Sequence, residues 1–274
     1  VPHEDFLAKI NAVRYAFLEL GVPNGIIVAR TDSLGASLTQ KVPVSKEPGD
    51  LASQYNAFLE SAPVNDLSEL AENDIIIHQQ GNLVKPLRLD NGLYAFRKDT
   101  GFDRVVLDCV TSLKHGADLL WIETEKPNVA QIAGMVNEVR KHVPDAKLVY
   151  NNSPSFNWTL AFREQVYGEW QADGKDLSAD PDPATTPRGL LAPEMDETPL
   201  AQEADQLVQQ FQRDASREAG IFHHLITLPT YHETALGTDV LSQGYFGDLG
   251  MLAYVRDIQR QEIRRDMACL LYTS

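Results

Sequence analysis

The sequence predicts an α/β fold built around a parallel sheet. Four largely apolar runs of strand length lie at residues 25–29, 118–122, 147–150 and 221–226, and helical segments separate them. Continuous apolar runs are typical of parallel strands, because both faces of a parallel sheet are covered. Helices that connect consecutive strands are also what such a sheet requires.

Each helix is predicted from apolar residues that recur every three or four positions. The first runs from Phe6 to Leu20 and ends at Gly21, and the others cover residues 102–114, 127–139, 201–217 and 249–267. Pro127 is expected at the first position of its helix, where a missing N–H is harmless. Cys109 falls within a helical apolar pattern and is interpreted as a buried, unreactive thiol.

Two regions lack a clear period. Residues 34–98 contain turn-like sequences at 46–50, 61–63 and 79–82, so we interpret them as an insertion with its own small helix and hairpin. Residues 173–199 are rich in Asp, Pro and Thr and are interpreted as an irregular surface excursion. The carboxylates of this excursion lack the ligand spacing of a calcium loop.

The composition bounds the class of protein. The chain has 274 residues and 43% hydrophobic content, which is enough for one large core. Its formal net charge is −15, from 24 basic and 39 acidic residues, and this argues against general nucleic-acid binding. No segment approaches the roughly 18 consecutive apolar residues of a membrane span. Two isolated cysteines suggest no disulfide framework, so a reducing cytoplasm fits best.

Chemically distinctive residues follow each predicted strand. Arg30, Glu123, residues 151–155 and Thr227 stand at the four strand ends. Ligands of parallel sheets bind at the carboxyl ends of the strands. A cation, a carboxylate, amides and hydroxyls at one edge therefore predict a cleft for a polar, carboxylated molecule, without naming a reaction.

The same residues also have structural interpretations. Arg30 could be an ion-pair partner of Asp32 or Glu123. Ser153 or Ser155 could cap the following helix, since serine is a preferred N-cap. These interpretations stay open beside the functional one.

The histidines show no metal-ligand spacing. His223 and His224 are neighbours on a predicted strand, so they point to opposite faces and a shared metal ion is disfavoured. Four further histidines are interpreted as surface or packing residues: His3, His78, His115 and His142.

Four sequence motifs together resemble the isocitrate lyase family. They are Val28-Ala29-Arg30-Thr31-Asp32, Trp121-Ile122-Glu123-Thr124, the nine residues from Tyr150 to Trp158, and Ile226-Thr227-Leu228 followed by His232. The nine-residue motif is the most specific of them, and the resemblance covers residues 1 to about 267. Asn152, where many members carry Cys, and the insertion at 34–98 indicate a divergent branch.

The resemblance implies a (β/α)8-type barrel, the TIM barrel of the isocitrate lyase and phosphoenolpyruvate mutase superfamily. It also implies a cytoplasmic homotetramer with bound Mg²⁺ that cleaves isocitrate reversibly to glyoxylate and succinate in the glyoxylate cycle. The reaction is a retro-aldol: the hydroxyl loses its proton, the carbon–carbon bond breaks, and charge collects on the succinate fragment. Preorganised donors must meet that charge.

The resemblance assigns roles to the residues at the strand ends. Arg30 would clamp a substrate carboxylate, for which its planar fork is suited, and Glu123 would lie near the metal. The succinate portion would be hydrogen-bonded by Asn151, Ser153, Ser155 and Thr227. Asn152 and Pro154 would shape the loop, and His232 would contact the edge of the site.

Other parts of the family pattern are expected upstream of Val1. These are the catalytic Lys-Lys-Cys-Gly-His segment, the metal-binding aspartates and the first strands of the barrel. Residues 1–274 are therefore expected to be the C-terminal half of one catalytic barrel domain with helical extensions, without a catalytic residue and inactive alone. A half-barrel would expose unpaired strand edges. The apolar tail after Met267 is expected not to be native.

Two alternatives stay open. A sister lyase acting on 2-methylisocitrate or a related substrate would share Arg-Thr-Asp but generally lacks the Ser-Pro-Ser-Phe-Asn-Trp run. A fragment without catalysis could act only in oligomer assembly, with a helical excursion over residues 160–219 at a subunit interface. That excursion is expected to need a partner because four residues form an apolar face, namely Phe162, Val166, Tyr167 and Trp170.

Overall fold

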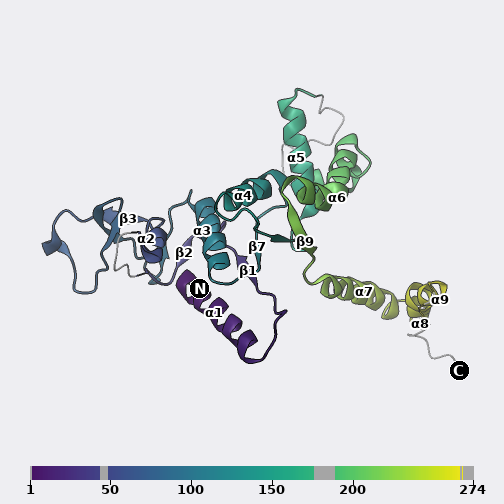
Figure 1. The fold of residues 1–274 in the computed structure, drawn as a ribbon. Coiled ribbons are helices and arrows are strands. Elements are labelled where there is room, and N and C mark those ends of the chain that lie inside the picture. Colours follow the sequence, from purple (N-terminus) through teal and green to yellow (C-terminus); the bar gives the residue numbers. More distant parts are fainter. Residues whose placement is uncertain (1, 44–48, 176–188, 266, 268–274) are drawn as a thin grey trace. The chain divides into compact units, whose positions relative to one another are not determined.

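The computed structural model of the protein describes residues 2–43, 49–175, 189–265 and 267 (Figure 1). They divide into two compact units. The first contains the described residues up to 152 and from 156 to 225, and the second contains residues 153–155 and the described residues from 226 onward.

The first unit is built on a parallel sheet, as the sequence predicts. Its four strands lie in the order β1-β7-β8-β9, and all neighbours are parallel. Their bounds are Val28–Thr31 (β1), Leu119–Ile122 (β7), Leu148–Asn151 (β8) and Ile221–Leu225 (β9). The α/β prediction is confirmed, because helices connect these strands in the expected order (Figure 1).

Five long helices accompany the sheet in the first unit. They are α1 (His3–Glu19), α3 (Gly101–Lys114), α4 (Val129–His142), α5 (Trp158–Ala172) and α6 (Pro199–Glu218). The side chain of Asn128 caps α4 by accepting the N–H of Gln131 at 2.9 Å. Pro127 therefore lies before the cap, two residues ahead of the first helical residue Val129, and the prediction that it opens the helix is wrong. Two short 3-10 turns precede α6, at Gly189–Leu191 (η3) and Pro193–Met195 (η4).

The two faces of the sheet differ along β1 and β7. Alternate residues are buried, with Thr31 and Ile122 on the buried face, while Arg30 and Trp121 lie on the opposite, half-exposed face. The buried face packs against apolar residues of α3 and α4, such as Val105 and Ile132. Each such fully buried side chain contributes about 1.5–3 kcal/mol of stability.

The prediction for Cys109 is confirmed. Its side chain is buried in this core, and burial raises the pKa of the Cys109 thiol, which keeps it protonated and unreactive. Cys269 lies outside the described residues.

Residues 34–98 form a small core of their own inside the first unit. It consists of five buried apolar residues: Val42, Leu59, Ile77, Val84 and Tyr94. Around it lie α2 (Leu51–Asn56), the pair β2 (Leu38–Thr39) and β6 (Tyr94–Ala95), the sheet β3-β5-β4 (Ser61–Pro63, Asn82–Pro86, Ile77–Gln79), and a 3-10 turn, η1 (Leu67–Glu69). The helix and hairpin expected here are therefore present.

Two turn predictions in this region have different outcomes. Gln80 and Gly81 join β4 to β5 with φ values of 49° and 82°, the backbone that a tight hairpin turn requires. Residues 61–63, predicted as a turn, instead form the edge strand β3. An edge position tolerates Pro63, because proline can lack its N–H where no further strand needs it.

The prediction that α5 needs a partner chain for its apolar face is wrong. Phe162 and Val166 are buried, and the ring of Phe162 lies 6.0 Å from that of Phe211 on α6. The indole N–H of Trp170 on α5 donates to the carboxylate of Glu203 on α6 at 2.9 Å. The face is thus covered within the first unit.

The second unit is mainly helical. It contains α7 (Pro229–Tyr245), α8 (Met251–Tyr254), a π-helical turn, η5 (Val255–Gln259), and α9 (Arg260–Arg264). The sequence does not predict α7, and the final helix predicted over 249–267 is divided by the π turn. No side chain of α7 is buried. The tail after Met267, predicted not to be native, lies outside the described residues.

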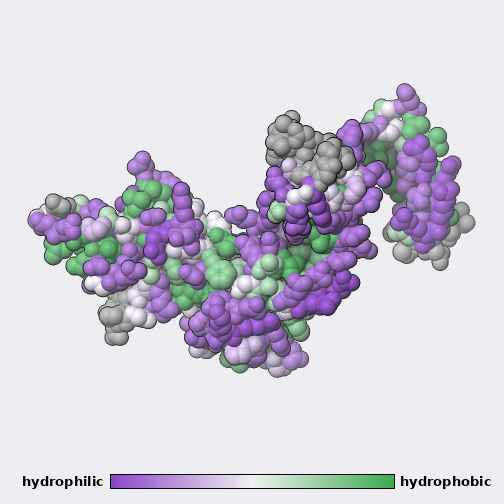
Figure 2. All heavy atoms as spheres, turned by 90° about the horizontal axis from the view of Figure 1, so that it is seen from above, coloured by the Kyte–Doolittle hydropathy of each residue, from purple (hydrophilic) through white to green (hydrophobic). Residues whose placement is uncertain are grey.

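One face of the described residues is seen in Figure 2. Hydrophilic residues cover much of the face in Figure 2, with hydrophobic residues between them. Among the described residues, no helix combines the length and the apolar character needed to cross a bilayer.

Candidate functional site

The ends of three neighbouring strands bring together Arg30, Glu123 and Asn151. Parallel strands β1, β7 and β8 end at the same edge of the sheet, so the side chains that follow them meet. Arg30 Nη2 lies 3.4 Å from Glu123 Oε1, and Asn151 Nδ2 donates to the same oxygen at 3.4 Å. A cation, an acid and an amide thus form one cluster, which we call the strand-end cluster.

Arg30 already holds a carboxylate in this cluster. Its Nε and Nη2 donate to the two oxygens of Asp32 at 3.0 and 2.8 Å. This hydrogen bonding, followed by the charge of Glu123, raises the pKa of the Arg30 guanidinium, so the cation is firmly maintained. The structural interpretation of Arg30 as an ion-pair partner is therefore what the structure shows. The contact also demonstrates that the fork is oriented to bind a carboxylate in bidentate fashion.

Trp121 completes the cluster and was missed as a site residue by sequence reasoning. The Arg30 guanidinium lies over its ring, 4.8 Å from the centroid, and its indole N–H donates to Glu123 Oε1 at 2.7 Å. The signal was available, because Trp121 lies two positions before Glu123 on a strand and thus shares its face. The indole fixes Arg30 by cation–π attraction and Glu123 by a hydrogen bond.

Tyr150 supports the cluster from the buried face. Its hydroxyl is 2.7 Å from Thr124 Oγ1, and both groups are buried. Burial raises the pKa of Tyr150 to about 12, so the phenol stays neutral. This contact fixes the segment after β7, which carries Glu123.

Asn152 extends the hydrogen bonding of the sheet. Its backbone N–H donates to Leu225 O at 2.8 Å, and its side-chain Nδ2 donates to the same carbonyl at 3.3 Å. These bonds continue the pairing of β8 with β9 past the last strand residue. Asn152 therefore shapes the start of the loop.

Five predicted site residues belong to the second unit: Ser153, Pro154, Ser155, Thr227 and His232. The backbone N–H of Ser155 donates to Ser153 Oγ at 3.2 Å, which closes a turn. Their proposed place beside Arg30 stays a prediction. Thr227 precedes Leu228, which has φ 57°, at the start of α7. His232 is exposed on α7, with its ring 5.6 Å from that of Tyr231.

The alternative in which a serine caps the following helix is wrong. Helix α5 begins after Asn157, whose Oδ1 accepts the backbone N–H of Leu160 at 3.0 Å. Asn157 takes the cap because it directly precedes the first helical residue, whereas Ser155 lies two positions earlier.

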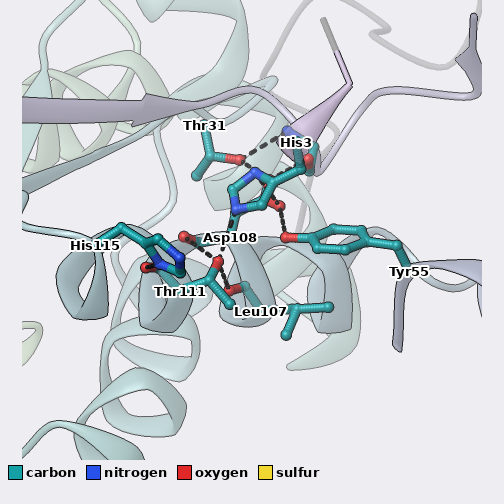
Figure 3. A network of polar contacts seen from close by, with 8 residues as sticks. His3, Thr31, Tyr55, Leu107, Asp108, Thr111 and His115 are labelled. Atoms are coloured by element: carbon teal, nitrogen blue, oxygen red, sulfur yellow. Dashed lines mark hydrogen bonds and ion pairs between the residues drawn. The ribbon is translucent and has the colours of Figure 1, made fainter. Parts of the chain in front are cut away.

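A second polar cluster lies on the buried face of the sheet, and sequence reasoning missed it. Figure 3 shows Asp108 of α3 at its centre. Thr31 Oγ1 donates to Asp108 Oδ2 at 2.6 Å, Tyr55 OH donates to Oδ1 at 2.5 Å, and His3 Nδ1 lies 3.1 Å from Oδ1. The hydroxyl of Ser33 also donates to Oδ2. We call this group the Asp108 cluster.

Burial controls the ionisation of the groups around Asp108. It raises the pKa of the Tyr55 phenol, and the charge of Asp108 raises it further, so Tyr55 remains a donor. Burial lowers the pKa of His3 below its ordinary value of 6.5, against the opposing effect of Asp108. The interpretation of His3 as a packing residue holds, because its side chain is only 11% exposed and lies between Asp108 and Thr111 (Figure 3).

A cavity of about 680 Å³ adjoins both clusters in the first unit. Arg30 and Asp32 line it together with His3, Tyr55 and apolar residues of the 34–98 segment. Its wall includes none of the other predicted site residues. The edge of β1 thus faces a space large enough for a small molecule.

The described residues do not fit a magnesium site. Within them, no group of three His, Cys, Asp or Glu side chains is arranged to hold a metal ion. Glu123 Oε1 already faces the Arg30 cation and two donors. Arg30 would repel a metal ion bound to the same carboxylate oxygen, so the strand-end cluster does not by itself supply the main metal ligands. Of the neighbouring pair His223 and His224 on β9, His224 has a protein partner, because its Nε2 lies 2.9 Å from Ser216 Oγ.

The fold and the strand-end cluster define a class. It is an α/β protein that presents a carboxylate-binding arginine at the carboxyl edge of a parallel sheet, where proteins of this architecture bind small molecules. The sequence model of the isocitrate lyase family matches residues 68–170. An isocitrate lyase of Pseudomonas aeruginosa is 60% identical over 270 residues, which cover 98% of this chain and 50% of that enzyme. The chain belongs to the isocitrate lyase family.

Two more distant relatives share shorter regions. An isocitrate lyase of Oryza sativa is 32% identical over 146 residues, or 53% of this chain and 18% of that enzyme. A mitochondrial 2-methylisocitrate lyase of Hypocrea atroviridis is also 32% identical, over 158 residues that cover 57% of this chain and 20% of that enzyme. The chain thus spans about half the length of the Pseudomonas relative, and its alignments with these two cover less.

Proposed function

We propose that the chain forms part of an isocitrate lyase, which cleaves isocitrate reversibly to glyoxylate and succinate in the glyoxylate cycle. The observation that carries the proposal is the bidentate contact of Arg30 with a carboxylate at the strand end, beside Glu123 and Asn151. The similarity to the Pseudomonas enzyme, over nearly the whole chain, supports the same reaction.

In this proposal a substrate carboxylate replaces Asp32 on the Arg30 fork. Both side chains of the present pair are substantially exposed, at 46% and 63%. Exposed ion pairs contribute only about 0–1 kcal/mol, so the exchange costs little. Trp121 holds the guanidinium in place during the exchange, because its ring packs beneath it.

The other residues would stabilise charge that develops on the succinate fragment. Asn151, Ser153, Ser155 and Thr227 are the proposed hydrogen-bonding residues. Glu123 would orient Arg30 and lie near Mg²⁺, whose main ligands we place outside these residues. The proton transfers are assigned to the Lys-Lys-Cys-Gly-His segment expected upstream, so the chain alone is proposed to be inactive.

The proposed complete enzyme is a cytoplasmic homotetramer with a (β/α)8 barrel. The four parallel strands and their helices support a barrel of which they would be part. Residues 34–98 are proposed as an insertion in that barrel domain, and residues 160–219 as a helical excursion near a subunit interface. Support for assembly comes from exposed apolar side chains of the second unit, such as Leu236 and Val240 on α7 and Phe246 directly after it.

A fusion tests the proposal. The chain would be joined to the preceding half of the Pseudomonas enzyme, and glyoxylate release from isocitrate would be measured with phenylhydrazine. We expect turnover by the fusion and none by the chain alone. Glyoxylate release by the isolated chain would contradict the assignment of the proton transfers to an upstream segment.

A second candidate is a 2-methylisocitrate lyase, which the similarity to the Hypocrea relative favours. The two substrates differ by one methyl group, which a fitted pocket distinguishes by about 1–3 kcal/mol. The ratio of kcat/KM for the two substrates, measured on the fusion, decides between them. A strong preference for 2-methylisocitrate would replace the first candidate. A folded fusion without activity on either substrate would instead favour the non-catalytic assembly role.

A further inference from the structure

Asp108 gathers polar partners from three separate segments of the first unit. His3 comes from α1, Thr31 from β1, Ser33 from the turn after β1, and Tyr55 from α2 in the 34–98 segment (Figure 3). Its side chain is only 7% exposed, so these contacts replace solvation by water. A buried carboxylate that accepts several hydrogen bonds fixes its donors strongly, because each bond to a charged group contributes about 1.5–3 kcal/mol.

Two of the donors flank the residues of the strand-end cluster. Thr31 follows Arg30 directly, and Ser33 follows Asp32, so held and exposed residues alternate along the chain. Successive strand residues point to opposite faces, and Thr31 is held on the face opposite to Arg30. The backbone N–H of Ser33 also donates to Thr31 Oγ1 at 3.2 Å, which closes the turn.

The contact with Tyr55 extends this arrangement to the 34–98 segment. Tyr55 is buried, and its hydroxyl bonds to the oxygen of Asp108 that also faces His3. The guanidinium of Arg104 is buried one turn earlier on α3 and provides a favourable charge near Asp108. The carboxylate therefore has both the donors and the opposite charge that a buried anion needs.

We propose that Asp108 is a positioning residue for Arg30. It anchors Thr31 and Ser33 from behind the sheet, and it couples the 34–98 segment to the strand-end cluster through Tyr55. The role of Arg30 toward substrate rests on the proposed function, but its position is measurable without any activity. Trp121 is the reporter, since the Arg30 guanidinium lies over its ring.

The test uses ¹⁹F NMR of the chain labelled with 5-fluorotryptophan. The chain has three tryptophans, and Trp121→Phe assigns the reporter signal. We expect Asp108→Asn and the isosteric Thr31→Val to move the Trp121 signal by more than its linewidth, while those of Trp158 and Trp170 stay in place. Tyr55→Phe should move the Trp121 signal in the same direction by a smaller amount.

Two controls separate positioning from general destabilisation. Arg163→Gln removes another buried polar group, whose Nη2 donates to Asp196 at 2.7 Å, and should leave the Trp121 signal unchanged. The double variant Asp108→Asn/Thr31→Val should move the signal no further than Asp108→Asn alone, because both act through one contact. An unchanged Trp121 signal in folded Thr31→Val and Asp108→Asn proteins would overturn the proposal. An inactive fusion would count against the lyase function and leave this result unaffected.

Discussion

The two faces of the sheet at the end of β1 carry polar clusters of similar composition but different access to solvent. The strand-end cluster joins Arg30 to Asp32 and Glu123, and its arginine is 46% exposed. The Asp108 cluster joins one carboxylate to hydroxyls and an imidazole, and its carboxylate is 7% exposed. The first cluster can exchange partners at little cost, whereas the second cannot. Exposure therefore distinguishes the proposed binding site from a structural anchor.

The largest expected effect comes from removing the buried anchor. Asp108→Ala leaves several buried donors without an acceptor, so we expect the free energy of unfolding to fall by about 3–5 kcal/mol. Urea unfolding followed by circular dichroism measures it. Asp32→Ala, the matched exposed carboxylate, should cost no more than about 1 kcal/mol. Equal losses for the two variants would remove the distinction between the clusters.

The next effect concerns binding by the exposed cluster. Arg30→Lys in the active fusion keeps the charge and loses the planar fork, so the transition state should lose about 1.5–3 kcal/mol of stabilisation. The value of kcat/KM for isocitrate should therefore fall roughly 10- to 150-fold. Steady-state kinetics measure this loss, and thermal unfolding should show little change. An unaltered kcat/KM would show that Arg30 is only the ion-pair partner of Asp32.

A smaller loss is expected from the link to the 34–98 segment. Tyr55→Phe removes one hydroxyl donor from Asp108 and should lower the free energy of unfolding by about 1–2 kcal/mol. Tyr15→Phe, on the exposed side of α1, provides the control and should change stability by less than about 0.5 kcal/mol. If Tyr55→Phe is as neutral as its control, the coupling through Tyr55 is absent.

The smallest effect is a dependence of stability on pH. The folded pKa of His3 lies below its ordinary value of 6.5, so the unfolded chain binds this proton more readily. Stability contributed by neutral His3 is present above pH 6.5 and is lost as pH falls toward the folded pKa. Each unit of pKa depression corresponds to about 1.4 kcal/mol. In His3→Gln, urea midpoints between pH 7.5 and 5.5 should therefore decline less than in the parent chain; an identical decline would contradict the effect.

The sequence reveals the sheet and the exposed cluster because both follow local rules. The apolar runs mark the four strands, and residues that follow neighbouring parallel strands must meet at one edge, as Arg30 and Glu123 do. The Asp108 cluster obeys no local rule. Thr31 and Tyr55 are 77 and 53 residues from Asp108 along the chain, so only the folded structure brings them together.

Other elements escaped prediction for specific physical reasons. Helix α7 buries none of its side chains, so its sequence lacks the apolar stripe that reveals a packed helix. The apolar face of α5 suggested a partner chain, but α6 lies along it from a distant part of the sequence. A periodic pattern shows that a face must be covered and does not show by what.

The borders of the parallel sheet carry a practical consequence. Among the described strands, β1 and β9 each have a neighbour on one side only. A free parallel border presents amide and carbonyl groups that a matching strand can complete. Two polypeptides made separately, this one and a piece carrying the strands that we propose to complete the barrel, should consequently assemble into an active enzyme when mixed. Complementation of that kind would turn the chain into one component of a split reporter.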